Sequence, residues 1–146
     1  MKLAGKVALV TGASQGIGHA IAQGLAAEGA RIVVADLQRA DEAAAGFPDG
    51  VGLTVDVSTE DDVARMAEET VERCGGIDVL VNNAGLYASL AMRPFDEIPL
   101  EEWRRVMDVN VASMFLACRV VVPLMREQGG GKIVNISSGT PFRGVP

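Results

Sequence analysis

Short apolar runs alternate with amphipathic stretches along the whole of this 146-residue chain. The apolar runs lie at 6–11, 31–36, 51–55, 77–81 and 132–137, and each has the length of a buried strand. The amphipathic stretches lie at 16–28, about 39–46, 58–75 and about 100–127. This alternation predicts a parallel sheet with helices on both faces, in an open, doubly wound α/β arrangement. Residues 1–146 contain no repeat or linker, so we expect one domain.

Local signals add detail to the predicted helices. Ser58 is expected to cap the helix that follows it, with Asp61 completing an imperfect capping box. Pro123 removes one backbone hydrogen bond from the long helix at 100–127 and predicts a kink there. Two apolar faces are expected to pack on the sheet: Ile17, Ala20, Ile21, Gly24 and Leu25 in the first helix, and Val63, Met66, Ala67 and Val71 in the third.

Composition and charge narrow the classes of partner. Hydrophobic residues make up 49% of the chain and charged residues 22%, as in an ordinary globular protein. Nineteen acidic and 13 basic side chains give a net charge of −6, which disfavours binding to nucleic acid. The first strand begins too close to Met1 for a signal peptide, and no unbroken apolar run has the length of a membrane span. We therefore expect a cytoplasmic protein that binds neither nucleic acid nor membrane.

A glycine-rich turn joins the first strand to the first helix. Residues 11–18 read T-G-A-S-Q-G-I-G, a sequence that lets a pyrophosphate approach backbone N–H groups at a helix N-terminus. Gly12 permits the tight turn, Gly16 leaves room for the ligand, and Gly18 lets helix and strand pack closely. Asp36 ends the next strand, where a carboxylate can accept both ribose hydroxyls of NAD and repel the 2′-phosphate of NADP. Its alternative role is to cap a turn.

The same turn contains the pattern G-x-S-x-G of a serine hydrolase, with Ser14 as the nucleophile. Such an enzyme needs a histidine partner, and the only histidine, His19, lies five residues later in the same helix, where it cannot reach Ser14. We expect Ser14 to bind phosphate or cap the helix, and His19 to be a solvated helix residue. His19, Cys74 and Cys118 have no metal-ligand spacing, so no metal site is predicted.

Three further motifs lie in the second half of the chain. N-N-A-G at 82–85 follows the fourth predicted strand, Asn110 lies within M-D-V-N-V on the long helix, and I-S-S at 136–138 ends the fifth strand. Together with the glycine-rich turn, they resemble the short-chain dehydrogenase/reductase family along the entire chain. The resemblance implies a Rossmann-like sheet, here truncated after the fifth strand, and a homo-oligomer, dimer or tetramer, when the enzyme is complete.

The resemblance also implies roles for individual residues. Asp36 would bind the adenosine ribose, Asp56 and Val57 would border the adenine, and the 83–85 segment would support the sheet and line the nicotinamide-side ribose. Asn82 and Asn83 could instead be ordinary turn residues, and Asp56 could simply precede a helix cap. The implied cofactor-binding set is Gly12, Ser14, Gln15, Gly16, Ile17, Gly18, Asp36, Leu37, Asp56, Val57, Asn83, Ala84 and Gly85.

The resemblance implies two catalytic residues. Ser138 would hold the substrate oxygen, in preference to Ser137, because adjacent strand residues face opposite ways. Asn110 would kink the long helix and anchor a water in a proton relay, although it could also be a polar residue satisfied within the helix. Residues 140–142 are expected to touch the substrate pocket.

The family's Tyr-x-x-x-Lys pair does not occur in this sequence. Its one tyrosine, Tyr87, is followed four residues later by Ala91, and we interpret it as a pocket or surface residue. We therefore expect these residues to be the N-terminal portion of a longer NAD-dependent oxidoreductase that acts on a secondary alcohol or ketone, and to be inactive alone. The alternatives are a non-catalytic dinucleotide-binding module and a serine hydrolase built on Ser14.

Overall fold

The computed structural model describes residues 1–139. Five parallel strands form one sheet in the order β3-β2-β1-β4-β5, which confirms the predicted doubly wound, Rossmann-like arrangement. The chain runs outward from β1 in both directions, so the topological switch point lies between β1 and β4. The strands are β1 (Val7–Thr11), β2 (Arg31–Asp36), β3 (Val51–Thr54), β4 (Val79–Asn82) and β5 (Lys132–Asn135).

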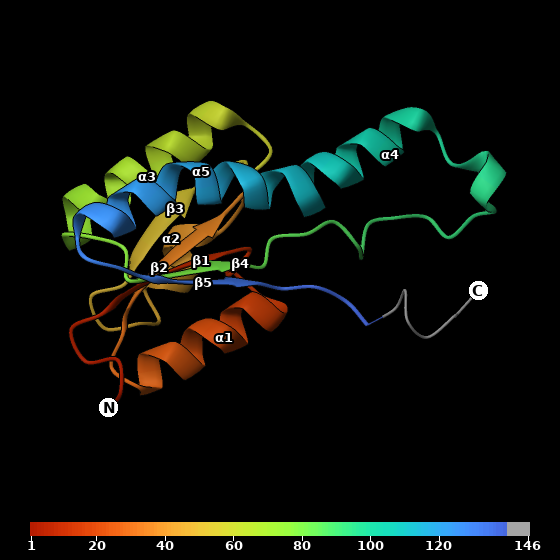
Figure 1. Cartoon of the computed structure of the whole chain (residues 1–146). Helices are drawn as coiled ribbons and strands as arrows, with labels where there is room; N and C mark the ends of the chain where they lie inside the picture. The colour runs from red at the N-terminus through yellow and green to blue at the C-terminus, as the bar shows by residue number, and fades with distance from the viewer. Residues whose placement is uncertain (140–146) are drawn as a thin grey trace.

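Helices cover both faces of the sheet (Figure 1). Helix α1 (Gly16–Ala27) lies on one face, and α3 (Glu60–Cys74) and α5 (Ser113–Glu127) lie side by side on the other. Successive β1 residues alternate between the two cores: Leu9 packs with the α3 and α5 residues, whereas Ala8 and Val10 pack with α1. The short helix α2 (Ala40–Ala44) connects β2 to β3 and packs against both strands. Burial on both faces explains why these strands are continuous apolar runs.

The predicted apolar face of α1 is wrong. Ile17 is 69% exposed, and Ala20 and Gly24 are also exposed. The buried positions are Gly18 and Ala22, with Ile21 and Leu25 partly buried beside them. The helix packs so closely on the sheet that its innermost positions are the smallest residues, so hydrophobicity does not mark the buried face.

The start of α3 also differs from the prediction. Thr59, not Ser58, is the residue that precedes the helix, and it makes no side-chain capping bond. The Ser58 N–H and hydroxyl both donate to Asp56 Oδ1, at 3.0 and 2.6 Å. Ser58 therefore bonds to Asp56 and does not cap the first turn of α3. Within the helix, Val63, Met66 and Ala67 are buried as predicted.

Strand β5 ends at Asn135, two residues earlier than predicted. Ile136 N donates to Asn82 O at 2.9 Å, and the ladder ends there. Ser137 and Ser138 thus lie beyond the strand, and the alternation of strand side chains cannot decide between them. Three of the four β5 residues are exposed, because β5 is the edge of the described sheet.

The long helical stretch is continuous from Leu100 to Glu127 but has an irregular centre. Helix α4 (Leu100–Met107) passes through a π-helical segment, η2 (Asp108–Ala112), into α5. The irregularity surrounds Asn110, as the family resemblance implies, whereas α5 continues through Pro123 to Glu127. Helix α4, the loop 86–99 and the 3-10 turn η1 (Phe95–Glu97) form an arm that projects from the sheet (Figure 1).

The Leu100–Glu127 stretch is long and apolar enough to cross a membrane, judged by length and composition only. The sequence prediction considered unbroken apolar runs and therefore missed this helix, which charged residues such as Arg119 interrupt. A core helix has the same composition, and α5 buries Leu116 and Val121 against α3 and the sheet. Packing in the core thus accounts for the apolar residues on the buried side of α5.

Candidate functional site

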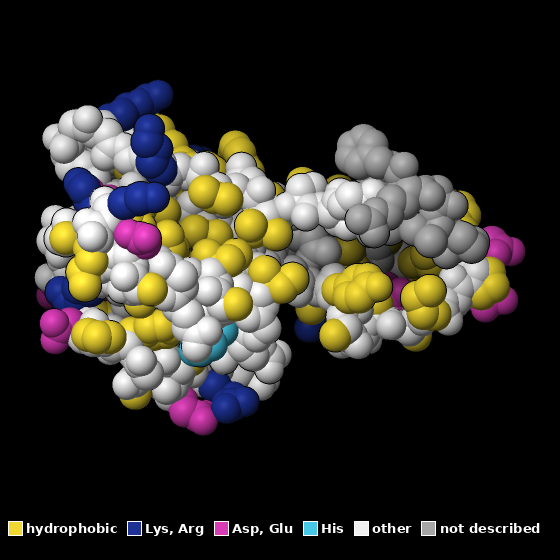
Figure 2. Space-filling model, turned by 90° about the horizontal axis from the view of Figure 1, so that it is seen from below, with side chains coloured by type: hydrophobic (Ala, Val, Ile, Leu, Met, Phe, Trp, Pro, Cys, Tyr) yellow, Lys and Arg dark blue, Asp and Glu magenta, His cyan; other side chains and the backbone are white. Residues whose placement is uncertain are grey.

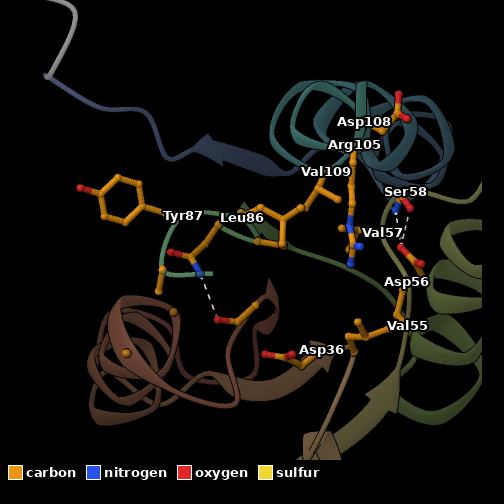
Figure 3. Close-up of a pocket in the computed structure, with 18 of the residues that line it drawn as sticks. Asp36, Val55, Asp56, Val57, Ser58, Leu86, Tyr87, Arg105, Asp108 and Val109 are labelled. Carbon is orange, nitrogen blue, oxygen red and sulfur yellow. Dashed lines mark hydrogen bonds between the residues drawn. The ribbon is translucent and has the colours of Figure 1, made fainter. Parts of the chain in front are cut away.

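A cleft of about 750 Å³ lies at the carboxyl ends of the strands, beside the topological switch point. The glycine-rich turn forms one wall, and α4 and η2 form the opposite wall (Figure 3). Twelve residues of the predicted cofactor-binding set line it: Gly12, Gln15, Gly16, Ile17, Gly18, Asp36, Leu37, Asp56, Val57, Asn83, Ala84 and Gly85. Ile17 is therefore exposed because it forms part of the cleft wall.

Two glycines of the turn adopt positive φ angles, +64° at Gly12 and +60° at Gly16, a region that side chains disfavour. A Cβ at Gly16 would meet no atom within 4 Å, so this residue leaves open space beside the cleft. Gly18 has a different role, because a Cβ there would lie 2.3 Å from Gly12 O and 2.4 Å from Asn83 Nδ2. The three glycines thus provide two backbone bends and one close contact.

Ser14 is the one member of the predicted cofactor set that does not line the cleft. Its hydroxyl donates to Gln38 O at 2.8 Å, and its N–H donates to Asp36 Oδ2 at 2.9 Å. The residue before α1 is Gln15, so the prediction that Ser14 caps the helix is wrong. Ser14 instead ties the glycine-rich turn to the loop after β2.

His19 is half-buried rather than solvated, which corrects the prediction. Its Nδ1 lies 3.2 Å from Ala13 O, and its ring centroid lies 5.4 Å from that of Phe47. Both Ser14 and His19 therefore contact main-chain carbonyls, and no hydrogen bond joins them within the described part of the chain. This is not the arrangement of a serine–histidine pair.

The Asp36 carboxylate lies at the cleft end of β2 (Figure 3). Besides Ser14 N, it accepts a longer bond from Gln38 N, at 3.4 Å to Oδ1. The nearby cation, Arg39, is held by Glu42 through two hydrogen bonds of 2.9 Å. Asp36 therefore combines a turn-stabilising role with a position facing the cleft, and Arg39 is directed to another carboxylate.

A second carboxylate supports the cleft behind Asp56. Asp62, in the first turn of α3, accepts the Asp56 N–H at 2.8 Å and pairs with Arg65 at 2.8 Å. The Arg65 hydrogen bond, followed by that from Asp56 N, holds the pKa of Asp62 below its ordinary value of 3.8. Asp56 in turn fixes Ser58, so a chain of polar contacts shapes this end of the cleft.

The pKa of Asp62 leads to a prediction about pH. Because it is lowered in the folded chain, the anion's stabilisation is fully present well above pH 3.8 and is lost as the pH falls through the folded pKa. Replacing Asp62 by asparagine should lower the free energy of unfolding near neutral pH. It should also make that free energy decrease less steeply as the pH is lowered, as measured by urea denaturation between about pH 3 and about pH 7. Asp61→Asn, in the same turn, is the matched control and should retain the wild-type slope.

The N-N-A-G segment is bound to β1 by side chains. Thr11 Oγ1 accepts the N–H groups of Asn83 and Ala84 at 3.0 and 3.1 Å, and Asn83 Nδ2 donates to Thr11 O and Gly12 O, both at 3.0 Å. Asn82 lies opposite Asn135 and donates to its Oδ1 at 2.8 Å. Both asparagines thus join strands together, and the interpretation of them as ordinary turn residues is wrong.

Asn110 does not line the cleft but holds one of its walls. Its Oδ1 accepts Leu86 N at 2.7 Å, and its Nδ2 donates to Leu86 O at 3.0 Å. Both polar atoms of the side chain therefore bond to the loop after β4. The alternative prediction, that Asn110 is a polar residue satisfied within its own helix, is wrong. The proton relay stays a prediction.

Replacing Asn110 by alanine should release this loop. Leu86 would lose both backbone hydrogen bonds, and we expect the free energy of unfolding to fall by about 1–3 kcal/mol. In hydrogen-exchange measurements the Leu86 amide should lose more protection than the amides of β2, which report only the fall in global stability. Unchanged protection of Leu86 would contradict this account.

The remaining predicted residues lie at the margin. Ser138 is exposed beyond β5 and is not among the residues that line the cleft. Tyr87 lines the rim, is 86% exposed and points away from the cleft (Figure 3), as expected of a surface residue. The predicted contacts of residues 140–142 lie outside the described residues.

Sequence reasoning missed the wall contributed by the arm. Glu101 and Arg105 lie four residues apart, a spacing that could have indicated one face of α4. Nothing in the sequence indicates that this face meets the strand ends, because a charged helix face usually points to solvent. The lining residues not predicted are Val55, Ser58, Leu86, Ala88, Glu101, Arg104, Arg105, Asp108 and Val109.

Comparison with known proteins agrees with this geometry. An uncharacterized oxidoreductase of Thermotoga maritima is 41% identical over 99% of this chain and 57% of its own length. The 2-(R)-hydroxypropyl-CoM dehydrogenase of Xanthobacter autotrophicus is 43% identical over 91% of this chain and 56% of its own length. The structure resembles the 3-ketoacyl-(acyl-carrier-protein) reductase of Brucella melitensis complexed with NADH, with a TM-score of 0.93 and 33% identity over 99% of this chain and 62% of that one.

The chain thus spans somewhat more than half the length of these relatives. Residues 6–146 match the family described as short chain dehydrogenase. The sheet order, the glycine-rich turn and the asparagine contacts are consistent with that match. This chain belongs to the short-chain dehydrogenase/reductase family of oxidoreductases.

Proposed function

We propose that the whole protein is an NAD-dependent oxidoreductase that transfers hydride between nicotinamide and a secondary alcohol or ketone. Residues 1–146 would hold the cofactor. The observation that carries the proposal is the Asp36 carboxylate, which faces the cleft beside the glycine-rich turn. Two relatives support the substrate class, since one is a 2-(R)-hydroxypropyl-CoM dehydrogenase and the other a 3-ketoacyl-(acyl-carrier-protein) reductase.

The residues of the cleft fit a dinucleotide. The open space at Gly16 lies at the N-terminus of α1, where backbone N–H groups can bind a pyrophosphate. Asp36 and Leu37 would contact the adenosine ribose, and Asp56 and Val57 would border the adenine. Asn83, Ala84 and Gly85 would line the nicotinamide-side ribose, and Gly12, Gln15, Ile17 and Gly18 the walls between them.

The preference for NAD over NADP follows from charge. The Asp36 carboxylate can accept ribose hydroxyls and repels a 2′-phosphate. Arg39, the nearest cation in sequence, already forms two hydrogen bonds with Glu42 and would have to leave them to neutralise a phosphate. We therefore propose NAD as the cofactor.

When bound, NAD supplies the hydride chemistry. Ser138 would orient the substrate oxygen and donate a hydrogen bond to the negative charge that develops there. Asn110 would anchor the proton relay and position Leu86 beside the cleft. A general acid is also needed, and the only tyrosine, Tyr87, lacks the lysine four residues later. The 146 residues by themselves are thus proposed to bind the dinucleotide without turnover.

Calorimetric titration of the purified 146-residue chain tests the cofactor proposal. NADH should bind at least about tenfold more tightly than NADPH, the difference expected when one carboxylate repels a phosphate. If circular dichroism shows the chain folded and it binds neither dinucleotide, the proposal that these residues hold the cofactor is overturned. Tighter binding of NADPH would overturn the NAD preference. Ketone-dependent oxidation of NADH by the same sample, free of longer protein, would contradict the proposed inactivity.

We also propose that the complete protein is a homo-oligomer, a dimer or tetramer, that buries an apolar stripe of the arm and its helix. Exposed apolar side chains recur there every three or four residues: Leu100, Trp103, Met107, Val111 and Phe115. Figure 2 shows hydrophobic side chains on the arm from another side. Trp103→Glu and Phe115→Glu should shift the mass measured by light scattering toward that of a monomer; an unchanged mass would oppose this interface.

A further inference from the structure

Arg105 extends from α4 into the cofactor cleft. It is one of the residues that line the cleft, and Figure 3 shows its side chain reaching from the helix toward Val57. Asp108, three residues later on the same helical stretch, points away from the cleft in this view. Arg104 also lines the cleft, but Arg105 is the arginine whose side chain Figure 3 shows extending toward the end of the cleft that β3 forms.

This guanidinium has no protein partner within residues 1–139, in either a hydrogen bond or an ion pair. Arg39, Arg65 and Arg119 each pair with a carboxylate. Glu101 lies one turn before Arg105, the usual spacing for an ion pair on a helix, yet the two form none. Arg105 therefore presents its flat face and its donors to whatever occupies the cleft.

Three valines line the cleft at the end where Arg105 lies, beside the polar residues Asp56 and Ser58. Val55 and Val57, buried at the end of β3, form the opposite surface, and Val109 lies one turn after Arg105. A flat guanidinium opposite branched aliphatic side chains suits a planar aromatic ring, because arginine stacks on aromatic faces. The valines would cover the face of such a ring with apolar surface, which they cannot do for a phosphate.

We propose that Arg105 stacks its guanidinium on the adenine of the bound dinucleotide and closes the adenine end of the cleft from the α4 side. The inference rests on the proposed function and adds to it a positioning residue on the arm. Asp36, on the glycine-turn side, would read the ribose of the same adenosine. The two sides of the cleft would thus recognise two parts of one nucleoside.

Calorimetric titrations with NADH and with AMP test the proposal on the 146-residue chain. Arg105→Met keeps an aliphatic side chain but lacks the planar cation, and it should weaken both ligands about three- to tenfold. Arg105→Lys keeps the charge but not the plane and should weaken both to a similar degree. Arg126→Met is the matched control, since Arg126 lies in the last turn of α5 outside the cleft lining and should leave both affinities unchanged.

A spectroscopic measurement separates stacking from a general loss of structure. Binding of AMP should lower the adenine absorbance near 260 nm in the wild-type chain, and Arg105→Met should abolish most of that change. Full affinity in Arg105→Met while the wild type binds NADH would overturn the role of Arg105 and leave the proposed function standing. Full affinity in Arg105→Lys would show that charge alone acts, and weakening of NADH without AMP would place Arg105 away from adenine; either result overturns the proposal. A wild-type chain that binds neither ligand would overturn both.

Discussion

Replacing Asp36 by serine should reverse the cofactor preference of the chain. A hydrogen bond to a charged group contributes about 1.5–3 kcal/mol, so NADH affinity should fall about ten- to a hundredfold when the carboxylate is removed. NADPH affinity should rise, because the negative charge at the end of β2 no longer opposes the 2′-phosphate. Calorimetric titration with both dinucleotides measures the two changes on one sample.

The Arg39–Glu42 pair offers a further step in the same experiment. In the Asp36→Ser variant, Arg39 is still held by Glu42 at 2.9 Å. Adding Glu42→Ala should free Arg39 and raise NADPH affinity again, whereas Glu42→Ala alone should leave NADH affinity unchanged. If Asp36→Ser loses no NADH affinity, the carboxylate serves only to hold Ser14 N and the turn.

The second large effect is expected at Gly18. A methyl group there would overlap Gly12 O at 2.3 Å and Asn83 Nδ2 at 2.4 Å, and a backbone carbonyl cannot move away easily. Gly18→Ala should lower the free energy of unfolding by about 3 kcal/mol, the upper end of overpacking costs, and should weaken NADH binding by distorting the turn. Urea denaturation followed by circular dichroism measures the first effect.

Gly24 is the control, because it lies in the same helix and a Cβ there meets nothing within 4 Å. Gly24→Ala should raise stability by about 0.5–1 kcal/mol, since alanine loses less backbone entropy in a helix. Equal stability changes in the two variants would mean that helix propensity, and not the contact between α1 and β1, governs both positions.

The sequence predicted the sheet well because the central residues of β1, β2 and β4 are buried in unbroken apolar runs. It also predicted which residues meet at the strand ends, since Gly12, Asp36 and Asn83 follow three strands that parallel pairing brings to one edge. It failed on α1, where Gly18 and Ala22 are buried and Ile17 is not. Close approach of helix and sheet selects small residues, which an apolar pattern does not identify.

The contacts between side chains and loops were less predictable. Asp56 accepts both hydrogen bonds from Ser58, and Asp62, not Asp61, accepts the bond from Asp56 N. Which carboxylate accepts each bond depends on the local backbone conformation. The arm was missed as a wall of the cleft because the direction of α4 is set by η2, whose π-helical turn shifts the phase of the helix. The family resemblance places the irregularity at Asn110, but the sequence does not show in which direction α4 then runs.

The hydroxyl of Thr11 has a consequence for mutational tolerance. It donates to Val81 O at 3.4 Å while it accepts two backbone N–H groups, so its one hydrogen and both lone pairs are engaged. Valine has the same shape but would leave both N–H groups without an acceptor at a position that is 2% exposed. Among the twenty amino acids, serine alone reproduces this set of bonds in so small a space. A library randomised at position 11 and selected for folded protein should therefore return almost only threonine and serine codons. Valine should be rare there, although it is common in buried apolar strands.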